Sequence, residues 1–169
     1  MSRHYLFKLF EPASVAVFGA SDRPNAVGTL VFSNLISSGF GGQIYPINPK
    51  RDEVQGHKAY TSLADIGKPI DLAVIVTQAP TVPAIINACG EYGVRDVVVI
   101  SAGFREVGEA GRRIENEVLE TARRHGIRFI GPNCLGVMRP AIGLNATFNH
   151  GMAEPGNIAL VSQSGSICT

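Results

Sequence analysis

Cysteine, histidine and charged residues are all scarce in this sequence of 169 residues. The three cysteines, Cys89, Cys134 and Cys168, have no paired spacing, which argues against a disulfide framework and favours reduced thiols. The four histidines form no metal-binding pattern with the cysteines, so we predict no metal site. Only 17% of the residues are charged and the formal net charge is +1, which argues against nucleic acid or an anionic membrane as a partner.

Long apolar runs are also missing. No run approaches the roughly 20 residues that a membrane-spanning helix requires, and residues 1–5 lack the core of a signal peptide. We therefore expect a cytoplasmic protein. Apolar residues still make up 45% of the chain, which is enough for the buried core of one domain of ordinary size.

The most informative stretch is Val15–Ser21, where four apolar residues run into Gly19, Ala20 and Ser21. An unbroken apolar run is typical of a central parallel strand that is covered on both faces. A glycine at its carboxyl end allows a sharp turn, and the helix that follows offers free N–H groups to a phosphate. The stretch predicts a phosphate-binding first turn, and a tight turn that binds nothing is the alternative.

Strands and helices are predicted to alternate along the rest of the chain. Apolar runs predict strands over Val15–Phe18, Gln43–Ile47, Asp71–Val76, Asp96–Ile100, Arg128–Ile130 and, at the end, Ile158–Val161. Helical spacing of apolar residues predicts helices over 27–38, 82–92 and 110–125. This alternation predicts an α/β fold, with a Rossmann-like, doubly wound, mainly parallel sheet and helices on both faces.

Ligands of such sheets bind beyond the carboxyl ends of the strands. Four turns lie there, at 19–23, 48–50, 77–80 and 101–104, and they are rich in small and hydroxyl residues. No Ser/His/Asp or Cys/His arrangement for nucleophilic chemistry accompanies them, so we predict a binding surface and no catalytic residue.

The second turn discriminates between cofactors. A NAD-binding fold usually has Asp or Glu after its second strand, whereas this chain has Asn48-Pro49-Lys50. A lysine there suits a phosphorylated ribose, and the first turn departs from G-x-G-x-x-G because Ser21 stands at its third position. These features favour NADP or coenzyme A (CoA). For Lys50 alone, a solvent-facing loop lysine is an equally good interpretation.

Five motifs in order resemble one family over nearly the whole chain. They are Gly19-Ala20-Ser21 with Gly28, Tyr45-Pro46-Ile47-Asn48-Pro49-Lys50, Ser101-Ala102-Gly103-Phe104, Gly131-Pro132-Asn133-Cys134-Leu135-Gly136 and Ser162-Gln163-Ser164-Gly165. The family is the CoA-binding domain of the NDP-forming acyl-CoA synthetases, related to the α subunit of succinyl-CoA synthetase. The segment 143–148 is most similar to a subgroup in which a synthetase-like region is joined to a GNAT acetyltransferase domain.

The resemblance implies a CoA or acyl-CoA site. Backbone N–H groups of the first turn would hold the phosphates, Lys50 would meet the phosphorylated ribose, and Asn133 and Cys134 would lie near the thiol end or the join with the next domain. The residues expected to bind the cofactor are Gly19, Ala20, Ser21, Asp22, Arg23, Gly28, Asn48, Pro49, Lys50, Thr77, Ala79, Pro80, Ile100, Ser101, Ala102 and Asn133.

The resemblance also implies a division of labour. Residues 1–156 would form the CoA-binding domain, and residues 157–169 would open a second, flavodoxin-type domain of a longer chain. The family's phosphorylated histidine lies in that second domain, beyond Thr169, so we expect this chain to bind CoA and not to catalyse. ATP or ADP would bind only to domains outside this chain, and a homo-oligomer is compatible with this organisation.

The favoured parent is an ADP-forming acid–CoA ligase, which converts a carboxylic acid to its acyl-CoA. One alternative is the acetyl-CoA-sensing part of a GNAT protein lysine acetyltransferase. Another is a stand-alone CoA-binding regulatory module, and an NADP-dependent reductase ranks third because no hydride-transfer residues are present. A histidine in the second domain would separate the ligase from the acetyltransferase.

Overall fold

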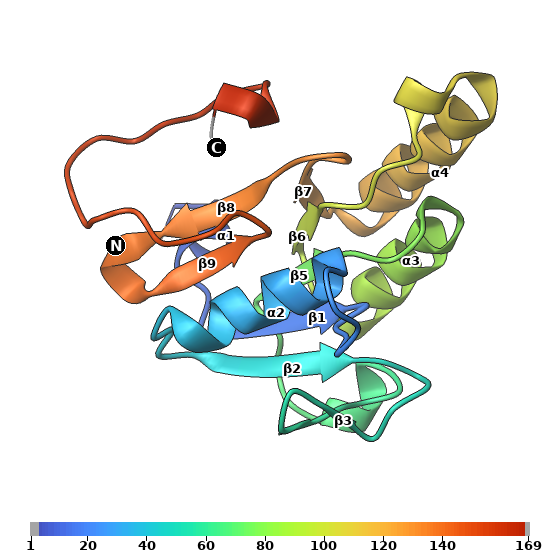
Figure 1. Cartoon of the computed structure of the whole chain (residues 1–169). Helices are drawn as coiled ribbons and strands as arrows, with labels where there is room; N and C mark the ends of the chain where they lie inside the picture. The colour runs from blue at the N-terminus through green and yellow to red at the C-terminus, as the bar shows by residue number, and fades with distance from the viewer. Residues whose placement is uncertain (1–3, 168–169) are drawn as a thin grey trace.

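The computed structural model describes residues 4–167 and contains one central parallel sheet (Figure 1). All strand pairs in this sheet are parallel, and the spatial order is β2-β1-β5-β6-β7. The strands are β1 (Ser14–Phe18), β2 (Gln43–Ile47), β5 (Leu72–Ile75), β6 (Asp96–Val99) and β7 (Arg128–Ile130). Five of the six predicted strands therefore exist, within a residue or two at their ends. The order reverses between β1 and β5, which is the topological switch point where ligands of open α/β sheets bind.

Helices cover both faces of the sheet, as predicted. Side chains alternate along β1, so Val15 and Val17 join the core beneath α2 (Val27–Ser37), while Ala16 and Phe18 join the opposite core. Two helices cover that opposite face, namely α3 (Val82–Tyr92) and α4 (Glu109–His125). The α/β, Rossmann-like fold class is confirmed.

Two small hairpins were not predicted. The first, β3 (Glu53–Val54) with β4 (His57–Lys58), lies in the connection after β2. The second, β8 (Gly136–Arg139) with β9 (Leu144–Thr147), is antiparallel and packs beside α2 (Figure 1). The side-chain amide of Asn34 in α2 donates to the carbonyls of Thr147 and Asn149, both at 2.8 Å, and so fixes this hairpin to the helix.

The predicted strand Ile158–Val161 is wrong. This segment has no strand pairing, and the side chains of Ile158 and Val161 are almost fully exposed, at 96% and 94%. An isolated apolar segment gains no ladder hydrogen bonds, and the described residues offer it no strand partner.

The remaining elements are short. They are α1 (Phe7–Phe10) and the 3-10 turns Ala64–Ile66, Ala79–Thr81, Arg105–Val107, Pro140–Ile142 and Gly165–Ile167. Within residues 4–167, no helix has the length and apolar character needed to cross a membrane.

Candidate functional site

The turn between β1 and α2 brings two backbone segments into close contact. Gly19 has a φ of +89°, a conformation that side chains rarely adopt. Gly28, in the first turn of α2, is buried against it, because a Cβ on Gly28 would lie 2.0 Å from the carbonyl oxygen of Gly19. The start of α2 therefore sits directly over the end of β1.

Three side chains hold the carbonyl groups of this turn. Asn48 Nδ2 donates to the carbonyl of Ala20 at 2.9 Å, Gln55 Nε2 to that of Ser21 at 3.0 Å, and Thr29 Oγ1 to that of Arg23 at 2.7 Å. Within residues 4–167, the backbone N–H groups of Ala20, Ser21 and Asp22 donate to no protein group. The turn thus presents unused donors, as an anion-binding turn does.

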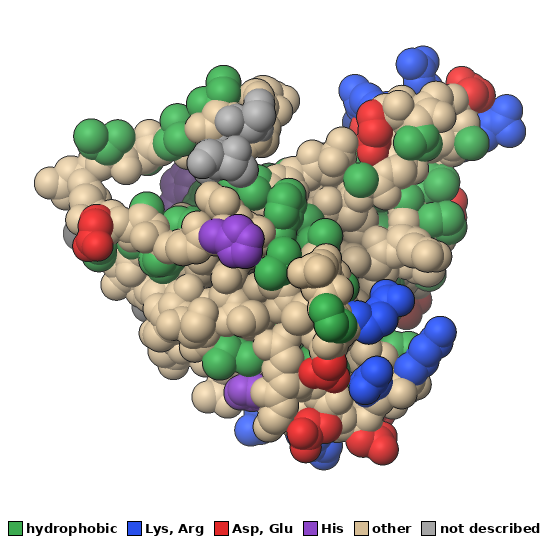
Figure 2. Space-filling view, viewed as in Figure 1, with side chains coloured by type: hydrophobic (Ala, Val, Ile, Leu, Met, Phe, Trp, Pro, Cys, Tyr) green, Lys and Arg blue, Asp and Glu red, His purple; other side chains and the backbone are tan. Residues whose placement is uncertain are grey.

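Charged side chains border the turn. Arg23, Lys50 and Arg51 are exposed in the loops that follow β1 and β2, where Figure 2 shows basic side chains. Asp22 pairs with Arg51 at 3.6 Å, and the backbone N–H of Lys50 donates to Asn48 Oδ1 at 3.0 Å. The second turn is therefore joined to the first, with Pro49 exposed between Asn48 and Lys50.

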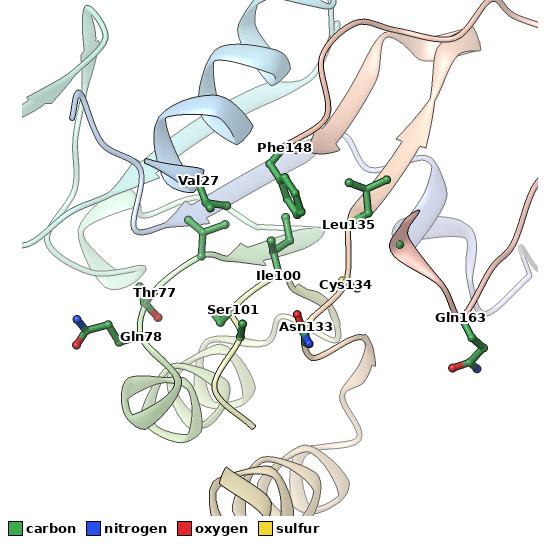
Figure 3. Close-up of a pocket in the computed structure, with 13 residues that line it drawn as sticks. Val27, Thr77, Gln78, Ile100, Ser101, Asn133, Cys134, Leu135, Phe148 and Gln163 are labelled. Carbon is green, nitrogen blue, oxygen red and sulfur yellow. The ribbon is translucent and has the colours of Figure 1, made fainter. Parts of the chain in front are cut away.

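An open cavity of about 780 Å³ lies beyond the carboxyl ends of β5 and β6. Its wall is divided in two (Figure 3): Val27, Ile100, Leu135 and Phe148 gather on one side, and Thr77, Gln78, Ser101 and Asn133 on the other. The full lining is Val27, Val76, Thr77, Gln78, Ile100, Ser101, Ala102, Asn133, Cys134, Leu135, Phe148, Gln163 and Gly165.

Five of the residues predicted to bind a cofactor line this cavity: Thr77, Ile100, Ser101, Ala102 and Asn133. The others lie outside it. Gly19, Ala20, Ser21, Asp22, Arg23, Gly28, Asn48, Pro49 and Lys50 form or flank the first two turns, and Ala79 and Pro80 begin the 3-10 turn before α3. The two regions adjoin, because a Cβ on Gly19 would lie 3.0 Å from Thr77 Cγ2 and Val27 opens α2.

Several lining residues were not predicted. Gln78 was inside a turn that the sequence singled out, so its position carried a signal. Phe148 follows β9, and its approach to the cavity depends on a hairpin that sequence reasoning treated as loop. Gln55 does not line the cavity and was also missed, although it contacts the first turn.

The loop after β7 supplies Asn133 and Cys134. Asn133 has a φ of +53°, and its N–H donates to the carbonyl of Ser101 at 2.9 Å, so this loop is held against the turn after β6. The thiol of Cys134 donates to the carbonyl of Val99 at 3.3 Å. Burial raises the pKa of Cys134 to about 11, so the thiol is protonated at neutral pH.

Within residues 4–167, no group of three or more His, Cys, Asp or Glu side chains is arranged to hold a metal ion. The site instead combines free backbone donors, flanking cations and a partly apolar cavity. These features suit a ligand with a phosphate group and a long, mixed-polarity body.

Residues 13–140 match the family described as the CoA binding domain. The chain belongs to this CoA-binding family. The predicted resemblance to the CoA-binding domain of the NDP-forming acyl-CoA synthetases is therefore confirmed.

Similar proteins include ligases from archaea. The chain is 45% identical over 163 residues to the α subunit of acetate–CoA ligase [ADP-forming] I from Pyrococcus furiosus, covering 94% of this chain and 35% of that protein. It is 44% identical over 162 residues to 4-hydroxybutyrate–CoA ligase [ADP-forming] from Nitrosopumilus maritimus, covering 95% and 23%.

A solved structure has the same fold. It is the dinucleotide-forming acetyl-coenzyme A synthetase 1 of Ca. Korarchaeum cryptofilum in complex with phosphate and ADP, with a TM-score of 0.90 and 41% identity, covering 96% of this chain and 34% of that one. The chain thus spans 23% to 35% of the length of these relatives.

Proposed function

We propose that this chain binds CoA or acyl-CoA as the cofactor-binding domain of an ADP-forming acid–CoA ligase. The observation that carries the proposal is the 45% identity to the Pyrococcus α subunit across 94% of the chain. The first turn supports it chemically, because the N–H groups of Ala20, Ser21 and Asp22 donate to no group among the described residues and α2 approaches the turn without a side chain at Gly28.

The ligand is assigned to the turns as follows. The unused N–H groups of Ala20, Ser21 and Asp22, within the Gly19–Arg23 turn, would hold the pyrophosphate, whereas those of Gly19 and Arg23 already donate to the carbonyl of Ile47 and to Ser21 Oγ. Lys50 would meet the phosphorylated ribose. The pantetheine arm would cross Thr77, Ala79 and Pro80 and then pass Ile100, Ser101 and Ala102 towards Asn133. The cavity is large enough and apolar enough on one side to accept that arm.

The remaining chemistry is assigned to other parts of a longer enzyme. We infer that residues 157–169 open a second domain, since Ile158 and Val161 are apolar and exposed, and no strand among the described residues pairs with them. ATP or ADP would bind there or in further domains, and those domains are the expected partners, alongside an optional second copy of the chain. Among the described residues, the cysteines Cys89 and Cys134 are free thiols, which fits a reducing cytoplasm.

Calorimetric titration of the 169-residue chain tests the proposal. CoA and acetyl-CoA should bind with dissociation constants between micromolar and sub-millimolar, and NADH far more weakly. Mixed with acetate, ATP and CoA, the chain should form no acetyl-CoA. NADH binding as tight as CoA would contradict the assignment of the cofactor.

A further inference from the structure

Gln55 occupies the tip of the β3–β4 hairpin and reaches the first turn from outside. Its φ of +48° is a left-handed conformation, uncommon for a residue other than glycine. The side chain is half-buried, and its Nε2 donates to two carbonyls at 3.0 Å, that of Ser21 in the first turn and that of Thr29 in α2. Both partners only accept, so the amide must present its nitrogen to them.

A third contact comes from the backbone of the same residue. The N–H of Gln55 donates to Asp22 Oδ1 at 2.7 Å. The hairpin therefore holds the first turn and the first helical turn of α2 together at three points, although 26 to 34 positions separate Gln55 from these partners in the sequence. Asp22 is held further by its ion pair with Arg51.

These contacts decide where the unused N–H groups of the turn point. In a trans peptide the carbonyl of one residue and the N–H of the next lie in one plane and point in opposite directions. The Ser21 carbonyl is directed at Gln55, so the N–H of Asp22 is directed away from the hairpin. The Ala20 carbonyl is directed at Asn48, so the N–H of Ser21 likewise points away from that side chain.

We propose that Gln55 is a positioning residue for the anion-binding turn, which presets the turn to receive the CoA pyrophosphate. This rests on the proposed function. Gln55 lies outside the cavity and acts through Ser21, Asp22 and Thr29. Without its amide the turn samples other orientations of these peptides, and the ligand must then select the competent fraction.

The alternative is that Gln55 only stabilises the fold. Substitution of a merely structural residue lowers the free energy of unfolding but leaves ligand affinity unchanged while the protein stays folded. Substitution of a positioning residue lowers the affinity for every ligand that carries the pyrophosphate, because the turn meets that group and no other. CoA and dephospho-CoA share the pyrophosphate, whereas pantetheine lacks it.

The test compares Gln55→Met with Arg95→Met. Arg95 directly precedes β6, at the amino ends of the strands and therefore at the opposite end of the strands from the first turn. Its side chain also donates two hydrogen bonds to backbone carbonyls, at 2.9 and 3.1 Å. Both variants lose two such bonds, so both should lose stability. Dissociation constants for CoA, dephospho-CoA and pantetheine are measured by calorimetry well below the melting temperature of each protein.

Gln55→Met should weaken CoA and dephospho-CoA equally, by about tenfold if the competent fraction falls to about a tenth. Pantetheine affinity, and all three affinities of Arg95→Met, should match those of the wild type. Gln55→Glu keeps the shape of the side chain but removes both donors. It replaces Gln55→Met in the test if Gln55→Met folds poorly, and it should show the same loss of affinity for CoA and dephospho-CoA.

The outcomes separate the two proposals. A wild-type chain that fails to bind CoA overturns the proposed function and this role with it. A wild type that binds CoA, with unchanged affinities in folded Gln55→Met and Gln55→Glu, overturns only the positioning role. An equal loss of affinity for pantetheine also overturns the positioning role, since pantetheine lacks the pyrophosphate that the first turn is proposed to bind.

Discussion

A methyl group on Gly28 would overlap the carbonyl oxygen of Gly19, because the Cβ would lie only 2.0 Å from it. The neighbour is backbone and cannot rotate away, so α2 or the first turn must shift to admit any side chain. The same close approach places the start of α2 beside the free N–H groups of Ala20–Asp22. Substitution of Gly28 therefore tests stability and ligand binding together.

Gly28→Ala should lower the free energy of unfolding by about 1–3 kcal/mol, the usual cost of forcing extra volume into a packed site. CoA affinity should fall at least about tenfold, because the displaced helix changes the turn that receives the phosphates. Gly41→Ala is the matched control, since a Cβ there meets nothing within 4 Å. Urea unfolding and calorimetry measure both effects, and normal CoA binding by a folded Gly28→Ala protein would exclude this turn as the site.

Lys50 should distinguish CoA from dephospho-CoA, which lacks the 3′-phosphate. A hydrogen bond to a charged group contributes roughly 1.5–3 kcal/mol when sheltered. Lys50 is exposed, so we take about 1–2 kcal/mol, or a five- to thirtyfold preference for CoA in the wild type. Lys50→Ala should remove most of this preference and leave dephospho-CoA affinity nearly unchanged, and added salt should weaken the wild-type preference.

Lys68→Ala, in an exposed loop away from the proposed site, should change neither affinity. If Lys50→Ala lowers the affinity for CoA and dephospho-CoA equally, Lys50 contacts the shared pyrophosphate or stabilises the fold. No effect on either ligand would make it a solvated loop residue.

The sheet and the turns at the carboxyl ends of its strands were predictable because local sequence determines them. The apolar run Val15–Phe18 is buried along its whole length, and the glycine that ends it has the positive φ that a sharp turn needs. The 780 Å³ cavity lies where the predicted turns after β5 and β6 meet, which is the edge of the sheet that the sequence singled out.

Contacts between segments far apart in the sequence could not be predicted in the same way. The β8–β9 hairpin is fixed by Asn34, more than 110 positions before the carbonyls it binds. Gln55 reaches the first turn only because a two-residue hairpin folds back over it. Ile158–Val161 has a strand's composition, but composition alone does not supply a neighbouring strand.

Glu115 should make part of the stability pH-dependent. This α4 carboxylate is buried and forms hydrogen bonds with Arg105 Nε at 2.8 and 2.9 Å. The bonds from Arg105 lower the pKa of Glu115 from its ordinary 4.5, against the opposing effect of burial. Because the folded-state pKa is the lower one, the stabilisation is present above about pH 4.5 and is lost as the pH falls through the folded value.

Glu115→Gln should therefore cost about 1–2 kcal/mol at neutral pH, a value kept low because Arg105 is mostly exposed. The difference between wild type and variant should shrink when unfolding is repeated in acid, below the folded pKa. Glu120→Gln, at an exposed position of the same helix, is the control and should change little. A difference that stays constant from neutral pH into acid would show that the charge of Glu115 is not the cause.

Cys134 offers a direct test of whether the ligand enters the cavity. Its thiol lines the cavity wall, and its pKa is raised to about 11, so only about 1 in 1,000 thiols is ionised at pH 8. Alkylation by iodoacetamide should be slow and should accelerate about tenfold per pH unit up to about pH 11, since the thiolate is the nucleophile. Cys89 is fully buried with a pKa of about 12, so it should react more slowly and serves as an internal reference. The third thiol is removed beforehand with Cys168→Ser, which lies outside the described residues.

Acetyl-CoA is the right protecting ligand, because its sulfur is acylated and does not consume the reagent. Present at about ten times its dissociation constant, it should slow alkylation of Cys134 about tenfold, as the free fraction of protein falls to about a tenth. Peptide mass spectrometry follows the modification of each cysteine separately, so a general tightening of the fold would be seen as equal protection of Cys89. Protection confined to Cys134 would place the pantetheine end of the ligand against the loop after β7. If acetyl-CoA binds without slowing the alkylation of Cys134, the pantetheine end lies outside the cavity and the site is limited to the first two turns.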